Sequence, residues 1–246
     1  MYAEIVSVGH EILMGEIVDT NSSYLASRLP ALGIQLRWVS QVGDDLDMLA
    51  DVMTRALSRS DLTLITGGLG PTEDDLTRDG IAKALAEEMY IDNDLVKELQ
   101  QFFRGRGGSM PPSNMRQANL IPSAKSIPNP RGTAPGWWVE TNGHIIVCMP
   151  GPPAEMDHMW ENHVRPELSK RSTGQVILTR TLKTFGYAEA ALGEMIKDYI
   201  QGDNPYLGIY ARQDGIHLRI IARGPTEDRA QAIIEPLEEE LRSLLG

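Results

Sequence analysis

Glycine and acidic residues are concentrated in one short stretch of the chain, which reads TGGLGPTEDD. Gly67, Gly68 and Gly70 carry no Cβ atom, so a polyanion can approach the backbone N–H groups there. The carboxylates of Asp74 and Asp75 would repel a bare phosphate, whereas a divalent cation binds carboxylate and phosphate oxygens together. The stretch therefore predicts a site where a metal ion joins a phosphorylated ligand to the protein.

The same stretch has a plainer interpretation, a tight turn between a strand and a helix with an aspartate as the helix cap. It contains neither the Gly-Lys-Ser/Thr of a Walker A loop nor the G-x-G-x-x-G spacing of a dinucleotide fold. We take the phosphate site as the prediction. A larger side chain at Gly68 is then expected to weaken ligand binding more than it weakens folding.

Strand and helix patterns alternate through the first two thirds of the chain. This order predicts an α/β fold with a mainly parallel, helix-covered sheet. Asn142-Gly143 is the strongest short hairpin signal, so an antiparallel hairpin is expected to extend the sheet. Pro166 is expected to end the helix that starts near residue 154. Strands are expected at residues 3–8, 34–42, 62–65, 137–140 and 144–149.

Polar residues follow several of these strands, and loops at the carboxyl ends of parallel strands line the ligand crevice of such sheets. Glu11 follows the first strand and is interpreted as a ligand or metal contact, with a solvated loop carboxylate as the alternative. Asp44 is balanced between site chemistry and helix capping, and Asn21 is better explained as a helix cap. Arg131 stands beside a turn and suits a phosphate or ribose, unless that turn is plain surface.

The composition is that of an ordinary globular protein, with 41% hydrophobic and 23% charged residues. A net charge of −11 opposes binding of nucleic acid or an anionic membrane, and an anionic small molecule would need a metal ion or a local basic pocket. No apolar stretch is long enough for a bilayer and no basic leader begins the chain, so we expect a cytoplasmic protein. Cys148, the one cysteine, is expected to be a core thiol.

The pattern changes after Pro166 to a β-α-β-β-α order, which needs a small core of its own. We place the boundary in residues 169–174. The predicted domains are residues 1–168 and a small α+β domain at residues 175–246.

Four ordered motifs closely resemble those of the competence/damage-inducible protein A (CinA) family. The motifs are GHEILMG with DTN, TGGLGPT with the following DD, GTAPG, and MPGPP with EM. The resemblance implies a first domain similar to the molybdopterin-binding fold of MogA and MoaB, and then a KH-like domain. Full CinA proteins continue into a nicotinamide mononucleotide deamidase domain that has no counterpart in this chain, so we expect no deamidation.

The resemblance also implies an activity, divalent-metal-dependent hydrolysis of ADP-ribose to AMP and ribose 5-phosphate. We assign Asp75 and Glu11 to the metal (Mg²⁺, Mn²⁺ or Co²⁺) or its water, and Asp74 and Asp44 to supporting roles. A homodimer is expected from the family. The predicted substrate contacts are Gly67, Gly68, Gly70, Thr72, Thr20, Asn21, Arg131 and Gly151.

Two other functions fit the same motifs. A pyrophosphate loop of this kind would serve adenylyl transfer to, or hydrolysis of, a molybdopterin or flavin nucleotide. A non-catalytic module that only binds a nucleotide is the third interpretation. Product analysis separates the three, because only a hydrolase releases AMP from ADP-ribose.

Overall fold

The computed structural model of the protein describes residues 1–171, 176–200 and 202–246. The chain forms two compact units, one made of Met1–Ser27 and Gln35–Arg171, the other of Arg28–Ile34 and Ser172–Gly246. The predicted boundary at residues 169–174 lies partly outside the described residues. In the described ranges, no helix has both the length and the apolar composition needed to cross a membrane.

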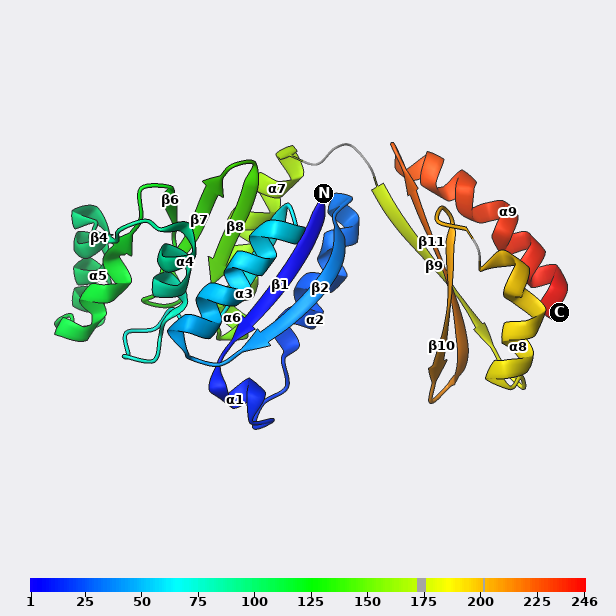
Figure 1. Ribbon diagram of the computed structural model, residues 1–246, viewed down its shortest axis with the longest axis horizontal. Coiled ribbons are helices and arrows are strands. Elements are labelled where there is room, and N and C mark those ends of the chain that lie inside the picture. The colour runs from blue at the N-terminus through cyan, green and yellow to red at the C-terminus, as the bar shows by residue number, and fades with distance from the viewer. Residues whose placement is uncertain (172–175, 201) are drawn as a thin grey trace. The chain divides into compact units, whose positions relative to one another are not determined.

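The first unit is built on a six-stranded sheet with the order β2-β1-β3-β8-β7-β6 (Figure 1). The first four strands are parallel, and β7 and β6 are added antiparallel at one edge. The predicted mainly parallel sheet is therefore confirmed. The strands are β1 (Tyr2–Val8), β2 (Gln35–Val42), β3 (Leu62–Thr66), β6 (Ala124–Ile127), β7 (Gly136–Thr141) and β8 (His144–Met149), and β4 (Tyr90–Ile91) pairs separately with β5 (Asn119–Leu120).

Helices cover both faces of this sheet. Val6 and Val8 of β1 share a buried core with Leu49 of α3, whereas the alternate residue Ser7 faces the other side and its hydroxyl lies 2.7 Å from that of Ser22 in α2. Figure 1 shows α3 and α2 over different parts of the sheet. The helices of this unit are α1 (His10–Leu13), α2 (Thr20–Arg28), α3 (Leu46–Arg59), α4 (Thr77–Leu85), α5 (Asn93–Gly105), α6 (Pro153–Met159) and α7 (Arg165–Arg171).

Two local predictions have different outcomes. The hairpin is confirmed, because Asn142 and Gly143 both have positive φ, 47° and 80°, and join β7 directly to β8. The stop at Pro166 is wrong, because α7 continues to Arg171. A π-helical turn, Trp160–Val164, ends two residues before the proline, and its wider hydrogen-bond spacing accommodates a residue that lacks an N–H group.

The second unit is a three-stranded antiparallel sheet with the order β10-β11-β9, and α9 packs on β11 and β9. Leu192 of α8, Leu218 and Ile220 of β11 and Ile234 of α9 share its core. The predicted small α+β arrangement is confirmed. Its elements are β9 (Val176–Thr184), α8 (Glu189–Ile196), β10 (Tyr206–Arg212), β11 (Gly215–Gly224) and α9 (Glu227–Leu245), and the 3-10 helices of the protein are η1 (Leu29–Leu32), η2 (Pro112–Ala118) and η4 (Lys197–Tyr199).

Candidate functional site

A cavity of about 660 Å³ opens where β1, β3 and β8 reach their carboxyl ends. The first residues after these strands, Gly9, Gly67 and Pro150, all line it. Thr72 and Arg131 are the two predicted site residues that do not. The predicted residues that the structure brings together there are Glu11, Thr20, Asn21, Asp44, Gly67, Gly68, Gly70, Asp74, Asp75 and Gly151.

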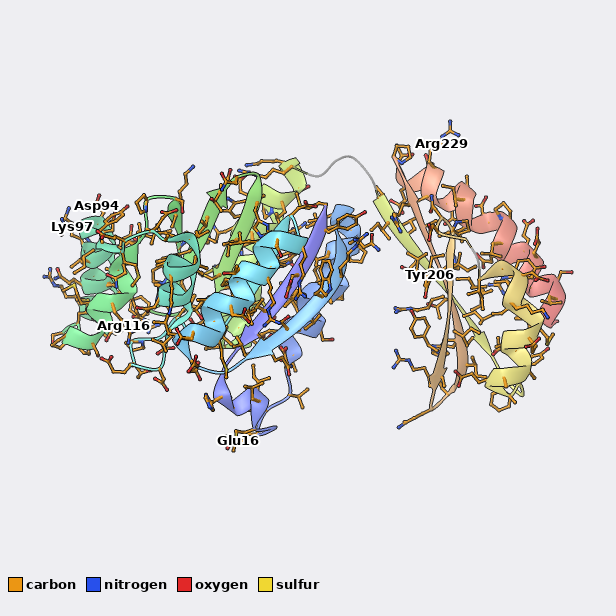
Figure 2. The ribbon with its side chains drawn as sticks, viewed as in Figure 1. Glu16, Asp94, Lys97, Arg116, Tyr206 and Arg229 are labelled. Carbon is orange, nitrogen blue, oxygen red and sulfur yellow. The ribbon has the colours of Figure 1, made fainter. Side chains whose placement is uncertain are left out.

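The glycine loop is held in place through its carbonyl oxygens. Thr77, at the start of α4, donates its hydroxyl to the Gly67 carbonyl at 2.8 Å and its N–H to the Gly68 carbonyl at 3.1 Å. Arg116 comes from η2 and is labelled in Figure 2; it donates to the Thr72 carbonyl and lies near the loop's acidic residues. These bonds engage the carbonyls of Gly67, Gly68 and Thr72 within the protein.

The backbone N–H groups of residues 67–70 differ in their partners. The Gly67 N–H donates to the Met149 carbonyl at 3.1 Å, and the Gly70 N–H donates to Asp75 at 2.7 Å. For the N–H groups of Gly68 and Leu69, the described residues supply no partner. Of the three glycines predicted to hold phosphate, Gly68 keeps this capacity, and Leu69 joins it.

Asp75 closes the loop on itself. Its Oδ1 atom accepts the Gly70 N–H at 2.7 Å, and its Oδ2 atom accepts both the N–H and the hydroxyl of Thr72, the former at 2.9 Å. A carboxylate has about four lone-pair positions, so Oδ1 retains one for a further contact. Thr72 therefore serves Asp75 rather than the cavity.

The helix cap at α2 is Asp19 and not Asn21. Asp19 accepts the Ser22 N–H at 3.0 Å and the Ser22 hydroxyl at 2.5 Å. Partial burial alone would raise the pKa of Asp19, but these hydrogen bonds hold it below its usual value. Asn21 instead donates its amide to the Gly151 carbonyl at 2.8 Å, and its buried Oδ1 atom has no partner among the described residues.

The remaining predicted residues are held in different ways. Glu11 folds back over Gly9, where an added Cβ atom would lie 2.6 Å from its Oε1 atom. Asp44 accepts the His10 N–H at 2.9 Å and still lines the cavity. Arg131 is exposed and donates to the Ala154 carbonyl at 3.0 Å, so its position gives no support to a ligand contact.

The charged side chains that line the cavity are all acidic, and no lysine or arginine occurs among the described residues of its wall. Within the same described ranges, no group of three or more His, Cys, Asp or Glu side chains is placed to hold a metal ion. Mg²⁺ commonly binds through one or two carboxylates together with ligand phosphates. This wall therefore fits a cation that is shared with a phosphorylated ligand. Its carboxylates are Glu11, Asp19, Asp44, Asp74, Asp75 and Glu155.

Comparison with known proteins places both units. Residues 4–170 match the family described as a probable molybdopterin binding domain, and residues 179–246 match the damage-inducible protein CinA KH domain. The crystal structure of the protein CinA with unknown function from Thermoplasma acidophilum superposes with a TM-score of 0.64 and 34% identity, covering 68% of this chain and 99% of that one. The chain belongs to the CinA family.

Relatives in the CinA family match along the whole chain. The CinA-like protein of Thermomicrobium roseum is 47% identical over 246 residues, which are 100% of this chain and 61% of that protein. The CinA-like protein of Deinococcus radiodurans is 41% identical over 250 residues, again 100% of this chain and 61% of that protein. The chain thus spans about three fifths of the length of these curated relatives, and the resemblance seen in its motifs is confirmed.

Sequence reasoning missed Gln117 and Arg78, two polar residues that support this site. Gln117 is 1% exposed, lines the cavity and donates to the Leu69 carbonyl at 3.2 Å. Arg78 is 3% exposed and donates to the same carbonyl at 2.9 Å. Neither has a local signal, because both are buried only by segments that are distant in the sequence.

The capping role of Asp19 predicts a stability effect that depends on pH. We expect Asp19→Ala to lower the free energy of unfolding by about 1 kcal/mol at pH 7. The pKa of Asp19 is lowered in the folded state, so its contribution is fully present above 3.8 and is lost as the pH falls through the folded-state pKa. Urea denaturation at pH 7 and at about pH 2 measures both, with the exposed Ser23→Ala as the control. A difference that is unchanged at the lower pH would contradict the assignment.

Proposed function

We propose that the cavity binds a nucleoside diphosphate derivative and that the protein hydrolyses ADP-ribose to AMP and ribose 5-phosphate with a divalent cation bound. One observation carries the proposal: Gly68 and Leu69, whose N–H groups have no partner among the described residues, line a cavity whose charged side chains are all carboxylates. Such a wall repels a bare diphosphate and accepts one that a cation has neutralised. The volume of about 660 Å³ suits a ligand of nucleotide size.

The cation would be held by Asp75 and Glu11, with Asp74 and Asp44 as supporting carboxylates of the wall. When bound, it neutralises charge on the diphosphate and lowers the pKa of a coordinated water molecule. The free lone pair on Asp75 Oδ1 supports this role, because the other positions of that carboxylate are occupied by the loop.

The protein's own groups would bind and orient the substrate. The N–H groups of Gly68 and Leu69 hold phosphate oxygens, and the unpartnered Oδ1 of Asn21 accepts a hydrogen bond from a ribose hydroxyl. In the reaction, a water oxygen bonds to one phosphorus as the bridging P–O bond breaks. The water proton passes to one of the carboxylates that line the cavity.

Product analysis tests the proposal directly. The purified protein is incubated with ADP-ribose, FAD, NAD or ATP in Mg²⁺, Mn²⁺ or Co²⁺, and the products are separated by chromatography. We expect AMP and ribose 5-phosphate from ADP-ribose, and no release when the cation is chelated. Two results would refute the proposal. One is turnover that chelation of the cation does not affect, and the other is no turnover of ADP-ribose with any of the three metals.

Adenylyl transfer is the second candidate, and the match of residues 4–170 to a probable molybdopterin binding domain favours it. A transferase would consume ATP only when a pterin or flavin acceptor is present. The same incubations, repeated with such an acceptor, distinguish the two reactions. Binding of a nucleotide without any turnover would instead indicate a binding module.

Gly151→Ala tests whether the backbone of this loop approaches the ligand closely. An added Cβ atom would meet only the Gly67 Cα atom, at the ordinary contact distance of 3.5 Å, so the fold should tolerate it. We expect the affinity for ADP in the presence of Mg²⁺ to fall about tenfold while the melting temperature stays within a few degrees. Gly105→Ala, which adds a Cβ in open space away from the cavity, is the control. Unchanged affinity in the Gly151 variant would place the ligand away from this loop.

A further inference from the structure

Arg78 is a buried guanidinium directly behind the glycine loop. It lies in the first turn of α4 and is 3% exposed. Its two Nη atoms donate to the carbonyls of Leu69 at 2.9 Å and Pro135 at 2.8 Å, and the ring of Trp137 lies 5.9 Å from its Cζ atom. One side chain thereby ties the glycine loop to the loop that precedes β7.

The hydrogen bonds of Arg78 do not neutralise its charge. Both acceptors are carbonyls, and its Nε atom has no partner among the described residues. Burial lowers the pKa of Arg78 to about 10, which leaves it protonated at neutral pH. The charges of Asp75 and Asp79 act on Arg78 from a distance, but neither forms an ion pair with it. A buried charge without a direct ion pair is costly, so a further anion near the loop would be favoured.

The Leu69–Gly70 peptide group connects this cation to Asp75. Its carbonyl accepts from Arg78 and, at 3.2 Å, from Gln117, while its N–H donates to Asp75 Oδ1 at 2.7 Å. Hydrogen bonds in such a chain polarise and strengthen one another. The orientation of Asp75 therefore depends on the two donors behind the loop.

We propose that Arg78 is a positioning residue that fixes Asp75 through the Leu69–Gly70 peptide and supplies the positive charge that favours a diphosphate in this acidic cavity. This inference takes its class of ligand, a diphosphate, from the proposed function, and it deepens that proposal. Among the described residues, no lysine or arginine lines the cavity, so the wall itself does not supply this positive charge. The positive charge of Arg78 behind the loop offsets the repulsion between the carboxylates and a diphosphate before any ligand binds.

Arg78→Met and Arg78→Lys test this inference by calorimetric titration with ADP in Mg²⁺ and by thermal melting. Arg78→Met keeps the length of the side chain and removes its charge, and we expect ADP affinity to fall about tenfold or more. Arg78→Lys restores the charge without the paired donors and should recover part of the affinity. The melting temperature of ligand-free Arg78→Met should fall, because the buried carbonyls of Leu69 and Pro135 each lose a donor.

Two further variants keep the inference falsifiable. Thr63→Val removes a buried hydrogen bond to His144, distant from the loop, and should lower the melting temperature while leaving ADP affinity unchanged. Gln117→Leu removes the second donor to Leu69 and should reduce kcat for ADP-ribose, even if Arg78→Met fails to fold. If folded Arg78→Met binds ADP as tightly as the wild type, the inference is overturned. The same holds if Gln117→Leu keeps both the ADP affinity and the kcat of the wild type.

The test also separates this inference from the proposed function. Wild-type protein that binds ADP but never hydrolyses ADP-ribose would refute the hydrolase, whereas a loss of ADP binding in Arg78→Met would still support the positioning role. Hydrolysis by Arg78→Met with unchanged kcat and KM would overturn the positioning role and leave the hydrolase in place. Failure of the wild type to bind either ADP or inorganic pyrophosphate would refute both.

Discussion

Asp75→Asn should lower kcat/KM for ADP-ribose by about 10² or more, the range found when one electrostatic stabiliser is removed from an active site. The carboxamide keeps the size of the side chain but loses its charge. The two oxygens of Asp75 accept the N–H groups of Gly70 and Thr72. In the asparagine, the NH₂ group replaces one of these oxygens, so two hydrogen-bond donors would face each other. Steady-state kinetics in Mg²⁺, with circular dichroism to confirm folding, measure the effect.

Two companion variants separate the charge of Asp75 from its role in the loop. Glu73→Gln makes the same change of charge two residues away on a fully exposed side chain, and should have little effect. Thr72→Val removes one hydrogen bond to Asp75 without changing the charge, so we expect a loss well below that of Asp75→Asn. If folded Asp75→Asn keeps full turnover, this carboxylate holds the loop together and has no role in the reaction.

The sheet could be predicted from the sequence because its signals are local. Apolar runs mark β1 and β3, and the Asn142-Gly143 turn determines the pairing of β7 with β8. Local geometry also decides between the two interpretations of Asp44, site chemistry and helix capping. Asp45 caps α3 by accepting the N–H groups of Asp47 and Met48, and this leaves Asp44 to line the cavity.

The support of the site could not be predicted, because it depends on packing between distant segments. The sequence of α4 presents Arg78 as an ordinary helix residue, and only the approach of Leu69 and Pro135 buries it. Gln117 stands in a short polar run that resembles a surface loop. Asn21 is not the cap of α2 that the sequence predicts, because its amide donates instead to the carbonyl of Gly151, a residue distant in the sequence.

Gly68→Val should destabilise the protein strongly, which corrects the expectation that ligand affinity would suffer more than folding. The φ angle of Gly68 is 62°, a region that a β-branched residue rarely adopts. A Cβ atom there would collide with the Thr77 hydroxyl and lie 3.1 Å from a Val8 methyl group. Since that hydroxyl also holds the Gly67 carbonyl, we expect the free energy of unfolding to fall by about 3 kcal/mol or more.

Gly107→Val is the matched control for this last prediction, because Gly107 has a φ of 77° with nothing within 4 Å of an added Cβ atom. It carries the backbone cost alone, about 1 to 2 kcal/mol. Urea denaturation of both variants isolates the cost of the collision with Thr77, which is the contact that fixes the loop to α4. Equal losses in the two variants would show that the loop relaxes around the new side chain, and the geometry of the phosphate site would then not depend on Thr77.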